Sequence, residues 1–210
     1  MKIIFCILVL LGFASAQFSE KAQEDILRIH NNLRSAIAKG EYRINGTLPN
    51  AASNMRKMKW SSALATAAQN VANNCREESS RTAGENIFQD YFSTPETVIA
   101  NIGAKASGAW VRDLEKLGWN SNKIDKATLG SKIAAATQMA WAETEFVGCG
   151  FNNCGKDSSK GNKSKILVVC HYKEIGNILN SNIYKEGDAC SSCPTGYKCE
   201  GDSGLCVVGI

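Results

Sequence analysis

The chain has 210 residues, of which 44% are hydrophobic and 21% charged; this composition is typical of one globular domain and excludes collagen-like or largely disordered chains. Its formal net charge is +4, from 24 Lys and Arg against 20 Asp and Glu, which is too small to indicate a nucleic-acid partner. It contains two histidines, His30 and His171, so multi-histidine metal sites and imidazole-based catalysis have few candidates.

The first 16 residues have the parts of a secretory signal peptide. Lys2 gives a positive start, residues 3–13 are apolar apart from Gly12, and residues 14–16 read Ala-Ser-Ala, a small-x-small cleavage site. A buried strand or helix is the alternative, and the run is too short for the ~20 residues that span a bilayer. Removal of residues 1–16 takes away Cys6 and leaves eight cysteines, which favours disulfides in an oxidising compartment. No later apolar stretch is long enough for a transmembrane anchor, so we expect a secreted protein.

The spacing of apolar residues predicts a first helix over residues 19–39. Ser19 suits its N-cap and Gly40 its end. The apolar positions recur at intervals of three and four, which is typical of an amphipathic helix: Ile26, Ile29, Leu33 and Ile37.

Three further helices are predicted. Ser61 begins the second, whose apolar face consists of Leu64, Ala67, Ala68, Val71 and Cys75. The third runs from Pro95, which suits a first helical turn, to about Leu117. Its apolar positions are Val98, Ile102, Ala106, Ala109 and Leu114. A fourth, shorter helix covers residues 131–141.

Short β-branched and aromatic runs predict strands at residues 87–88, 146–151 and 166–172, the last apolar enough to be central. Residues 157–165 have serines, lysines and a glycine but no apolar residue, which indicates a solvated hairpin loop between the last two strands. The pattern therefore predicts an α/β fold in which helices flank a small sheet.

The composition changes after Gly187. Four cysteines lie within seventeen residues, with too few apolar residues to fold without cross-links: Cys190, Cys193, Cys199 and Cys206. The Cys-x-x-Cys spacing also suits a redox pair or half of a zinc site, and the secretory start favours structural disulfides over both. We expect a domain over residues 17–186 and a disulfide-rich extension over residues 187–210.

The chain lacks the nucleophile-elbow, phosphate-loop and His-Glu-x-x-His motifs, so the corresponding hydrolase and nucleotide-binding functions have no support. Asn45 and Asn162 each begin an N-glycosylation sequon on a predicted loop. Residues 55–60 join three cations to Met and Trp; we interpret them as a solvated face over buried Met and Trp rather than as an anion-binding patch.

Several separated motifs resemble the CAP superfamily, the secreted cysteine-rich, antigen 5 and pathogenesis-related proteins. They occur at residues 137–141 (Thr-Gln-Met-Ala-Trp), 148–150 (Gly-Cys-Gly), 167–172 (Leu-Val-Val-Cys-His-Tyr), 176–177 (Gly-Asn), 30–34 (His-Asn-x-x-Arg) and 84–88 (Gly-Glu-Asn-Ile-Phe). With its cysteine-rich tail, the chain is most similar to the venom-allergen-like or activation-associated secreted proteins of nematodes. The resemblance spans residues 19–206 and implies a three-layer α-β-α sandwich. It also implies the disulfides Cys75–Cys154 and Cys149–Cys170, with the tail pairing Cys190–Cys199 and Cys193–Cys206.

Many CAP proteins have a cavity in which two histidines and two acids can bind a divalent cation. At the matching positions this chain has Ser79 and Ala135 in place of the histidines, and Glu85 and Asp113 as the acids. One hydroxyl and two carboxylates are poor ligands for zinc, which prefers imidazole and thiolate, and at most resemble a weak Mg or Ca site. We expect no tightly bound metal and no other cofactor. Hydrogen bonding and helix packing are the expected roles of His171 and His30.

The loss of the cavity histidines beside intact fold motifs favours a non-enzymatic protein that binds an extracellular protein, such as one of innate immunity or host defence. The alternative is a sterol or fatty-acid carrier, because related proteins hold sterols near the loop that here comprises Tyr172, Lys173, Glu174, Ile175, Gly176, Asn177 and Ile178. The charge of Glu174 counts against a lipid pocket there. A hydrolase using Glu85 and Asp113 as acid and base is the weakest hypothesis.

Overall fold

The computed structural model describes residues 18–43, 49–76, 84–118 and 121–209. The predicted signal peptide, Ser79 and Asn45 lie outside this part of the chain. Among the described residues, no helix has the length and apolarity required to cross a membrane.

A four-stranded sheet forms the middle layer, in the order β1-β3-β4-β2. Its strands are β1 (Lys59–Trp60), β2 (Gly84–Phe92), β3 (Phe146–Asp157) and β4 (Lys163–Lys173). β1 pairs parallel with β3, whereas β3 and β2 flank β4 in antiparallel fashion. Every residue from Ile166 to Tyr172 is buried, as expected for a central strand with helices on both sides.

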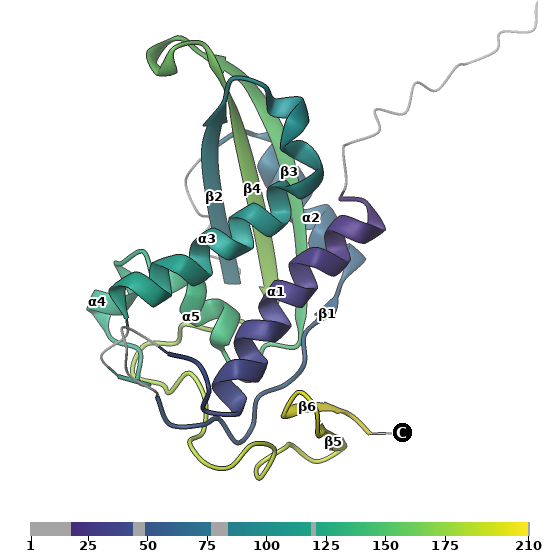
Figure 1. Ribbon diagram of the computed structural model, residues 1–210, viewed down its shortest axis with the longest axis vertical. Coiled ribbons are helices and arrows are strands. Elements are labelled where there is room, and N and C mark those ends of the chain that lie inside the picture. The colour runs from purple at the N-terminus through teal and green to yellow at the C-terminus, as the bar shows by residue number, and fades with distance from the viewer. Residues whose placement is uncertain (1–17, 44–48, 77–83, 119–120, 210) are drawn as a thin grey trace, which may run out of the picture.

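Helices cover both faces of the sheet (Figure 1). α2 (Ser62–Asn73) packs on one face, and α1 (Glu20–Ala38), α3 (Ile102–Leu117) and α5 (Ala134–Ala140) lie on the other, with the short α4 (Lys126–Leu129) beside them. The side chains of β4 alternate accordingly, with Leu167 and Val169 toward α2 and Val168 and Cys170 in the core under the other helices. The three-layer α-β-α sandwich is thus confirmed.

The first helix begins and ends as the sequence predicts. The side chain of Ser19 caps it by accepting a hydrogen bond from the Ala22 amide, and Gly40 follows its end with a positive φ of 66°. Ile26, Leu33 and Ile37 are buried.

The predicted apolar face of the second helix is only partly confirmed. Its buried residues are Ala65, Ala68, Gln69 and Ala72. Of the expected set, Ala68 is buried and Val71 packs partly buried against the same cluster, whereas Ala67 is exposed. Because alanines lie around the whole helix, the periodic signal is weak. Close packing on β3 decides which face of α2 is buried. A Cβ at Gly148 or Gly150 would overlap the backbone of Ala65 or Gln69. The amide of Gln69 then donates to the Phe151 carbonyl (2.7 Å) and accepts from its N–H (3.2 Å).

Other boundaries also differ from the prediction. Pro95 begins a 3-10 turn, η1 (Pro95–Thr97), followed by η2 (Ile99–Asn101), and the α-helix starts only at Ile102. α5 is shorter than residues 131–141, and α4 was not predicted. The hairpin loop is tighter than residues 157–165, because cross-strand hydrogen bonds extend β4 back to Lys163 and leave only the turn η3 (Ser158–Lys160), Gly161 and Asn162.

Four disulfides occur among the described residues, with the pairings that the resemblance implies. Cys75–Cys154 joins the end of α2 to β3, and Cys149–Cys170 crosses from β3 to β4. Cys190–Cys199 and Cys193–Cys206 cross-link the tail around its hairpin of β5 (Tyr197–Glu200) and β6 (Leu205–Val208). These bonds occupy the Cys-x-x-Cys sulfurs that a redox pair or a zinc site would need.

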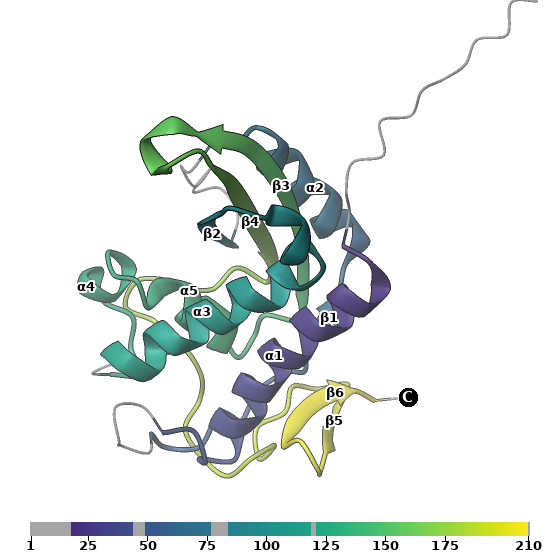
Figure 2. The ribbon, with the colours of Figure 1, turned by 45° about the horizontal axis from the view of Figure 1, so that its top comes forward.

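The tail is docked on the sandwich below α1 (Figure 2). Backbone hydrogen bonds join Cys206 to Met55 (2.7 Å) and to Lys57 (2.9 Å). The Lys57 ammonium pairs with the Glu200 carboxylate at 2.8 Å, and the Arg56 guanidinium lies over the Tyr197 ring. Residues 55–60 therefore bury their methionines, and two of their cations, Arg56 and Lys57, hold the tail.

Candidate functional site

Two helix-one residues that the motif analysis singled out are part of the core. His30 is fully buried, and its Nδ1–H donates to the Ile26 carbonyl (2.8 Å), because a carbonyl can only accept. Its Nε2 must then accept from the Tyr172 hydroxyl (2.9 Å), which in turn accepts from the Asn86 amide (3.0 Å). Burial lowers the pKa of His30 from 6.5 to about 4, so the ring is neutral at pH 7.

Arg34 occupies the centre of this side of the fold. Its guanidinium is fully buried and donates to five backbone carbonyls at 2.7–3.0 Å, those of Arg56, Met139, Trp141, Ala142 and Thr144. These carbonyls belong to the segment before β1 and to the end of α5 with the residues that follow it. Burial lowers the pKa of Arg34 to about 9, which leaves the group charged at neutral pH. The side chain thus fixes the path of the chain around the sheet end.

Glu85 and His171 form a pair on neighbouring strands. They face each other in the β2–β4 register, and the Glu85 carboxylate accepts from His171 Nε2 at 2.8 Å, with the carboxylate side chain fully buried. The adjacent Asn86 donates to the Ala135 carbonyl on α5 (2.9 Å), so alternation along the strand turns Glu85 to the opposite face. The hydrogen-bonding role expected for His171 is observed, and its partner was not foreseen.

Asp113 and Ala135 line one cavity of about 360 Å³ between α3, α5 and the edge strand β2. Trp110 and Phe88 contribute its apolar walls, and Lys132 lies at its border. Its described lining holds one carboxylate and no imidazole. Glu85 is not part of this lining, and alternation along β2 turns its side chain away from the face on which Asn86 contacts Ala135.

These residues do not fit a divalent transition metal. Zinc is typically held by four ligands, mostly imidazole and thiolate, whereas the pocket supplies one carboxylate and the methyl group of Ala135. Glu85 already accepts a hydrogen bond from His171. Within the described ranges, one cluster of three metal-binding side chains occurs, Cys190, Cys193 and Cys206, and all three are in disulfides.

The predicted lipid-binding loop is fixed at its base and apolar at its tip. Tyr172 is buried in the hydrogen-bond chain described above. Gly176 packs against Trp141, and its amide donates to the Gln138 side chain (3.0 Å). The Asn177 side chain bridges Thr137 and the Ala134 carbonyl at 2.7 Å each. The side chains of Lys173 and Glu174 are exposed.

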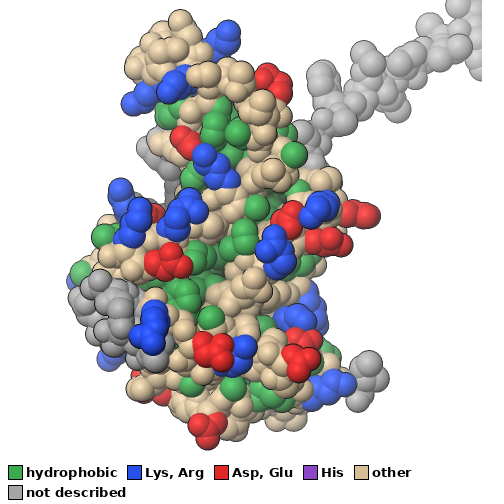
Figure 3. All heavy atoms as spheres, viewed as in Figure 1, with side chains coloured by type: hydrophobic (Ala, Val, Ile, Leu, Met, Phe, Trp, Pro, Cys, Tyr) green, Lys and Arg blue, Asp and Glu red, His purple; other side chains and the backbone are tan. Residues whose placement is uncertain are grey.

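Beyond this base, three large aliphatic residues are exposed: Ile175 (49%), Ile178 (51%) and Leu179 (40%). We name them the apolar loop cluster. Asn162, the sequon residue within the described chain, is exposed in the β3–β4 turn. On the face in Figure 3, acidic and basic side chains are interspersed, as the small net charge suggests.

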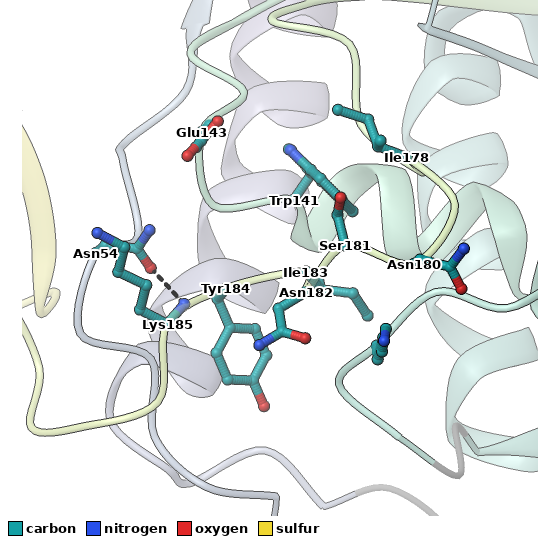
Figure 4. Close-up of a pocket in the computed structure, with 11 residues that line it drawn as sticks. Asn54, Trp141, Glu143, Ile178, Asn180, Ser181, Asn182, Ile183, Tyr184 and Lys185 are labelled. Carbon is teal, nitrogen blue, oxygen red and sulfur yellow. Dashed lines mark hydrogen bonds between the residues drawn. The ribbon is translucent and has the colours of Figure 1, made fainter.

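A pocket of about 510 Å³ lies beside the apolar loop cluster (Figure 4). Trp141, Asn54 and Glu143 line it together with Ile178 and residues 180–185. Trp141 belongs to a family motif, but it was not predicted to be a pocket residue, and no role was predicted for Asn54. A buried tryptophan beside polar loop residues was the available signal, but the loop of residues 178–185 carries no periodicity that could place it.

Comparisons with known proteins agree with this architecture. Residues 27–172 match the Cysteine-rich secretory protein family, named CAP. The chain is 30% identical over 189 residues to Scoloptoxin SSD43 of Scolopendra dehaani (84% of this chain, 81% of the relative). It is also 30% identical over 203 residues to a cysteine-rich venom protein of Tityus serrulatus, covering 92% of this chain. It spans only about half (48%) of that relative's length.

Two solved structures are similar over nearly the whole chain. "Structure of BmVAL-1" has a TM-score of 0.80 and 31% identity, covering 90% of this chain and 95% of that one. "Crystal structure of NaASP2 with Zn2+" has a TM-score of 0.79 and 30% identity, covering 91% and 97%. Their names confirm the venom-allergen-like and ASP resemblance. From its family motifs, its α-β-α sandwich and these relatives, the chain belongs to the cysteine-rich secretory protein (CAP) family.

Proposed function

We propose that this chain is a secreted, non-enzymatic CAP protein that acts by binding an extracellular protein through its surface. One observation carries the proposal. The cavity in which CAP proteins can bind a cation here has Ala135 at a histidine position, and Glu85 is paired with His171 on the other side of the sheet. The retained polar residues stabilise the fold. The binding function is therefore assigned to the surface of the molecule.

The apolar loop cluster is the contact surface that we favour. Ile175, Ile178 and Leu179 expose 40–51% of their surface on a loop whose base is held by Gln138 and Thr137. Aliphatic side chains on a firmly held loop lose little conformational entropy on binding, so burial of their surface translates into affinity. The predicted signal peptide supports an extracellular partner, as do relatives named as venom and secretory proteins.

The test is surface-binding measurement with immobilised residues 17–210 against purified extracellular proteins of host defence. We expect saturable binding by at least one candidate, weakened at least tenfold in Ile175→Ser/Ile178→Ser, about 1.4 kcal/mol. Leu117→Ser/Leu129→Ser, which removes exposed aliphatic groups elsewhere, is the matched control and should bind normally. Absence of binding across the panel, or equal loss in both variants, contradicts the proposal.

Sterol or fatty-acid binding is the second candidate, favoured by the same exposed aliphatic groups beside a pocket that Ile178 lines. The exposed charge of Glu174 opposes it, because a carboxylate beside an acyl chain must be desolvated. Binding of radiolabelled cholesterol and palmitate separates the two functions. A carrier should bind one of them saturably, more tightly in Glu174→Gln and less tightly in Ile175→Ser/Ile178→Ser. A chain that binds neither lipid is not a carrier.

A further inference from the structure

The pocket of about 510 Å³ beside the apolar loop cluster, which we name the Trp141 pocket, presents side-chain hydrogen-bond donors that no described residue accepts. The indole of Trp141 has one donor, Nε1–H, and the residue is only 3% exposed, yet this N–H forms no hydrogen bond with any described residue. Among the described residues, the enclosed side-chain polar atoms without a partner are Tyr42 Oη and Arg56 Nε, so the indole N–H is instead open to the pocket, where a bound molecule can accept from it.

Asn54 provides a second donor of the same kind. It is 7% exposed, and its Oδ1 accepts from the Lys185 amide at 2.8 Å, which fixes the orientation of the side chain. Its Nδ2 then faces the pocket and has no acceptor among the described residues. Figure 4 shows Asn54 and Trp141 bordering the space that Glu143 and the segment from Ile178 to Lys185 enclose.

The rest of the lining mixes charges and amides. Glu143 offers acceptors, Lys123 and Lys185 offer donors, and Asn180 and Asn182 offer both. Gly176 lies against Cγ of Trp141, so one side of the indole is covered near that atom and the N–H edge is the part left to make a directed contact. The pocket volume is within the usual range for small-molecule sites.

We propose that the Trp141 pocket binds a sugar unit, through hydroxyl groups that accept from Trp141 Nε1–H and Asn54 Nδ2 and donate to Glu143. A hydroxyl both donates and accepts, which matches this mixed lining. An acyl chain would displace water from the two N–H groups and leave them unpaired. A simple carboxylate ligand accepts hydrogen bonds but has no donor for Glu143. The pocket shares Ile178 with the apolar loop cluster, but the sugar proposal does not rest on the protein or lipid partner proposed above.

The test uses ¹H–¹⁵N spectra of labelled residues 17–210 titrated with glucose, galactose, mannose and N-acetylglucosamine, each to about 50 mM, because single sugar units bind weakly. The indole peak of Trp141 and the side-chain peaks of Asn54 are identified by their loss in Trp141→Phe and Asn54→Asp. At least one sugar should shift both sets of peaks saturably. Acetate and octanoate, as anionic and acyl-chain probes, should not.

Trp141→Phe keeps an aromatic ring and removes the donor, and Asn54→Asp keeps the acceptor for the Lys185 amide and removes the pocket donor. Each should weaken sugar binding at least fivefold. Trp110→Phe alters a buried tryptophan at the Asp113 pocket and should bind as the unaltered chain does. The inference is overturned if no sugar shifts these peaks, if acetate or octanoate shifts them equally, or if either folded pocket variant retains full affinity.

Discussion

The interior on the helix-one side of the sheet and the Trp141 pocket contain similar polar groups in opposite states. In the interior, the Arg34 guanidinium meets five carbonyls, and His30 and Asn86 are joined through the Tyr172 hydroxyl. In the pocket, Trp141 and Asn54 each present a donor that is open to the pocket and that no described residue accepts. The difference separates groups that build the fold from groups available to bind something else.

This distinction also applies to the residues of the family cavity. Glu85 is an acid that a catalytic or metal-binding role would require, and its carboxylate is bonded to His171 within the sheet. A residue that completes a hydrogen-bond network stabilises the fold. Its presence is then not evidence for a catalytic or metal-binding role. Substitutions in the interior should therefore lower the free energy of unfolding more than substitutions on the exterior.

The largest effect is expected from Arg34→Leu. This substitution removes one hydrogen-bond donor from each of five buried carbonyls. Unsatisfied buried groups cost about 1–3 kcal/mol each. We expect the free energy of unfolding to fall by about 5 kcal/mol in urea denaturation. Arg28→Leu, on the same helix but exposed in a pair with Asp25, is the control and should change it by less than about 1 kcal/mol. Equal effects would show that Arg34 is not the centre of the interior network.

The next largest effect on stability is expected from the disulfides, and it should differ between the sandwich and the tail. Loss of Cys75–Cys154, which closes 79 residues, should cost about 4 kcal/mol in the double serine variant, since the entropy gained by the unfolded chain grows with loop length. Loss of Cys190–Cys199, which closes 9 residues, should cost about 2 kcal/mol less. Thermal unfolding of both variants measures the difference. A larger loss from the tail disulfide would contradict this order.

Acid should weaken the interior through His30. Its pKa is lowered from 6.5 to about 4 by burial, so the unfolded chain binds a proton more readily throughout that interval. The free energy of unfolding therefore falls as the pH drops from 6.5 to 4, by on the order of 3 kcal/mol from this group. In His30→Gln the decrease in the free energy of unfolding between pH 7 and pH 4 should be smaller by that amount, as measured by denaturant titration at each pH. If the decrease is the same in the variant, His30 is not its source.

The smallest effect on stability should come from Ile178→Ser on the apolar loop cluster. The side chain is about half exposed, so its removal should change the free energy of unfolding by less than about 0.5 kcal/mol while altering binding. Thermal unfolding alongside the binding assay separates the two effects. A large destabilisation would place Ile178 in the fold rather than at the contact surface.

The sequence predicts the layers because capping and periodicity are local signals. Ser19 and Gly40 delimit the first helix, and the apolar run of residues 166–172 marks the central strand. Local signals do not predict features that depend on contacts with residues distant in the sequence. Gly148 and Gly150 select the buried face of α2, and cross-strand hydrogen bonds extend β4 to Lys163 despite its polar sequence.

The site was predicted less completely, for a related reason. Family motifs assign Glu85 and Asp113 to one cavity, but which face of the sheet a residue occupies depends on strand register, which sequence alone does not give. The same register brings Glu85 to His171. The Trp141 pocket depends on a loop of residues 178–185 whose path is fixed by distant partners such as Asn54 and Asn122.

The most direct test of the central claim is calorimetric titration of metal-free residues 17–210 with Zn²⁺. We predict no binding tighter than the millimolar range, because Ala135 contributes no ligand and Glu85 is bonded to His171. Ser79→His/Ala135→His, which restores both imidazoles of the family pattern, should gain affinity. Micromolar or tighter binding by the unaltered chain, lost in Asp113→Asn, would contradict the account.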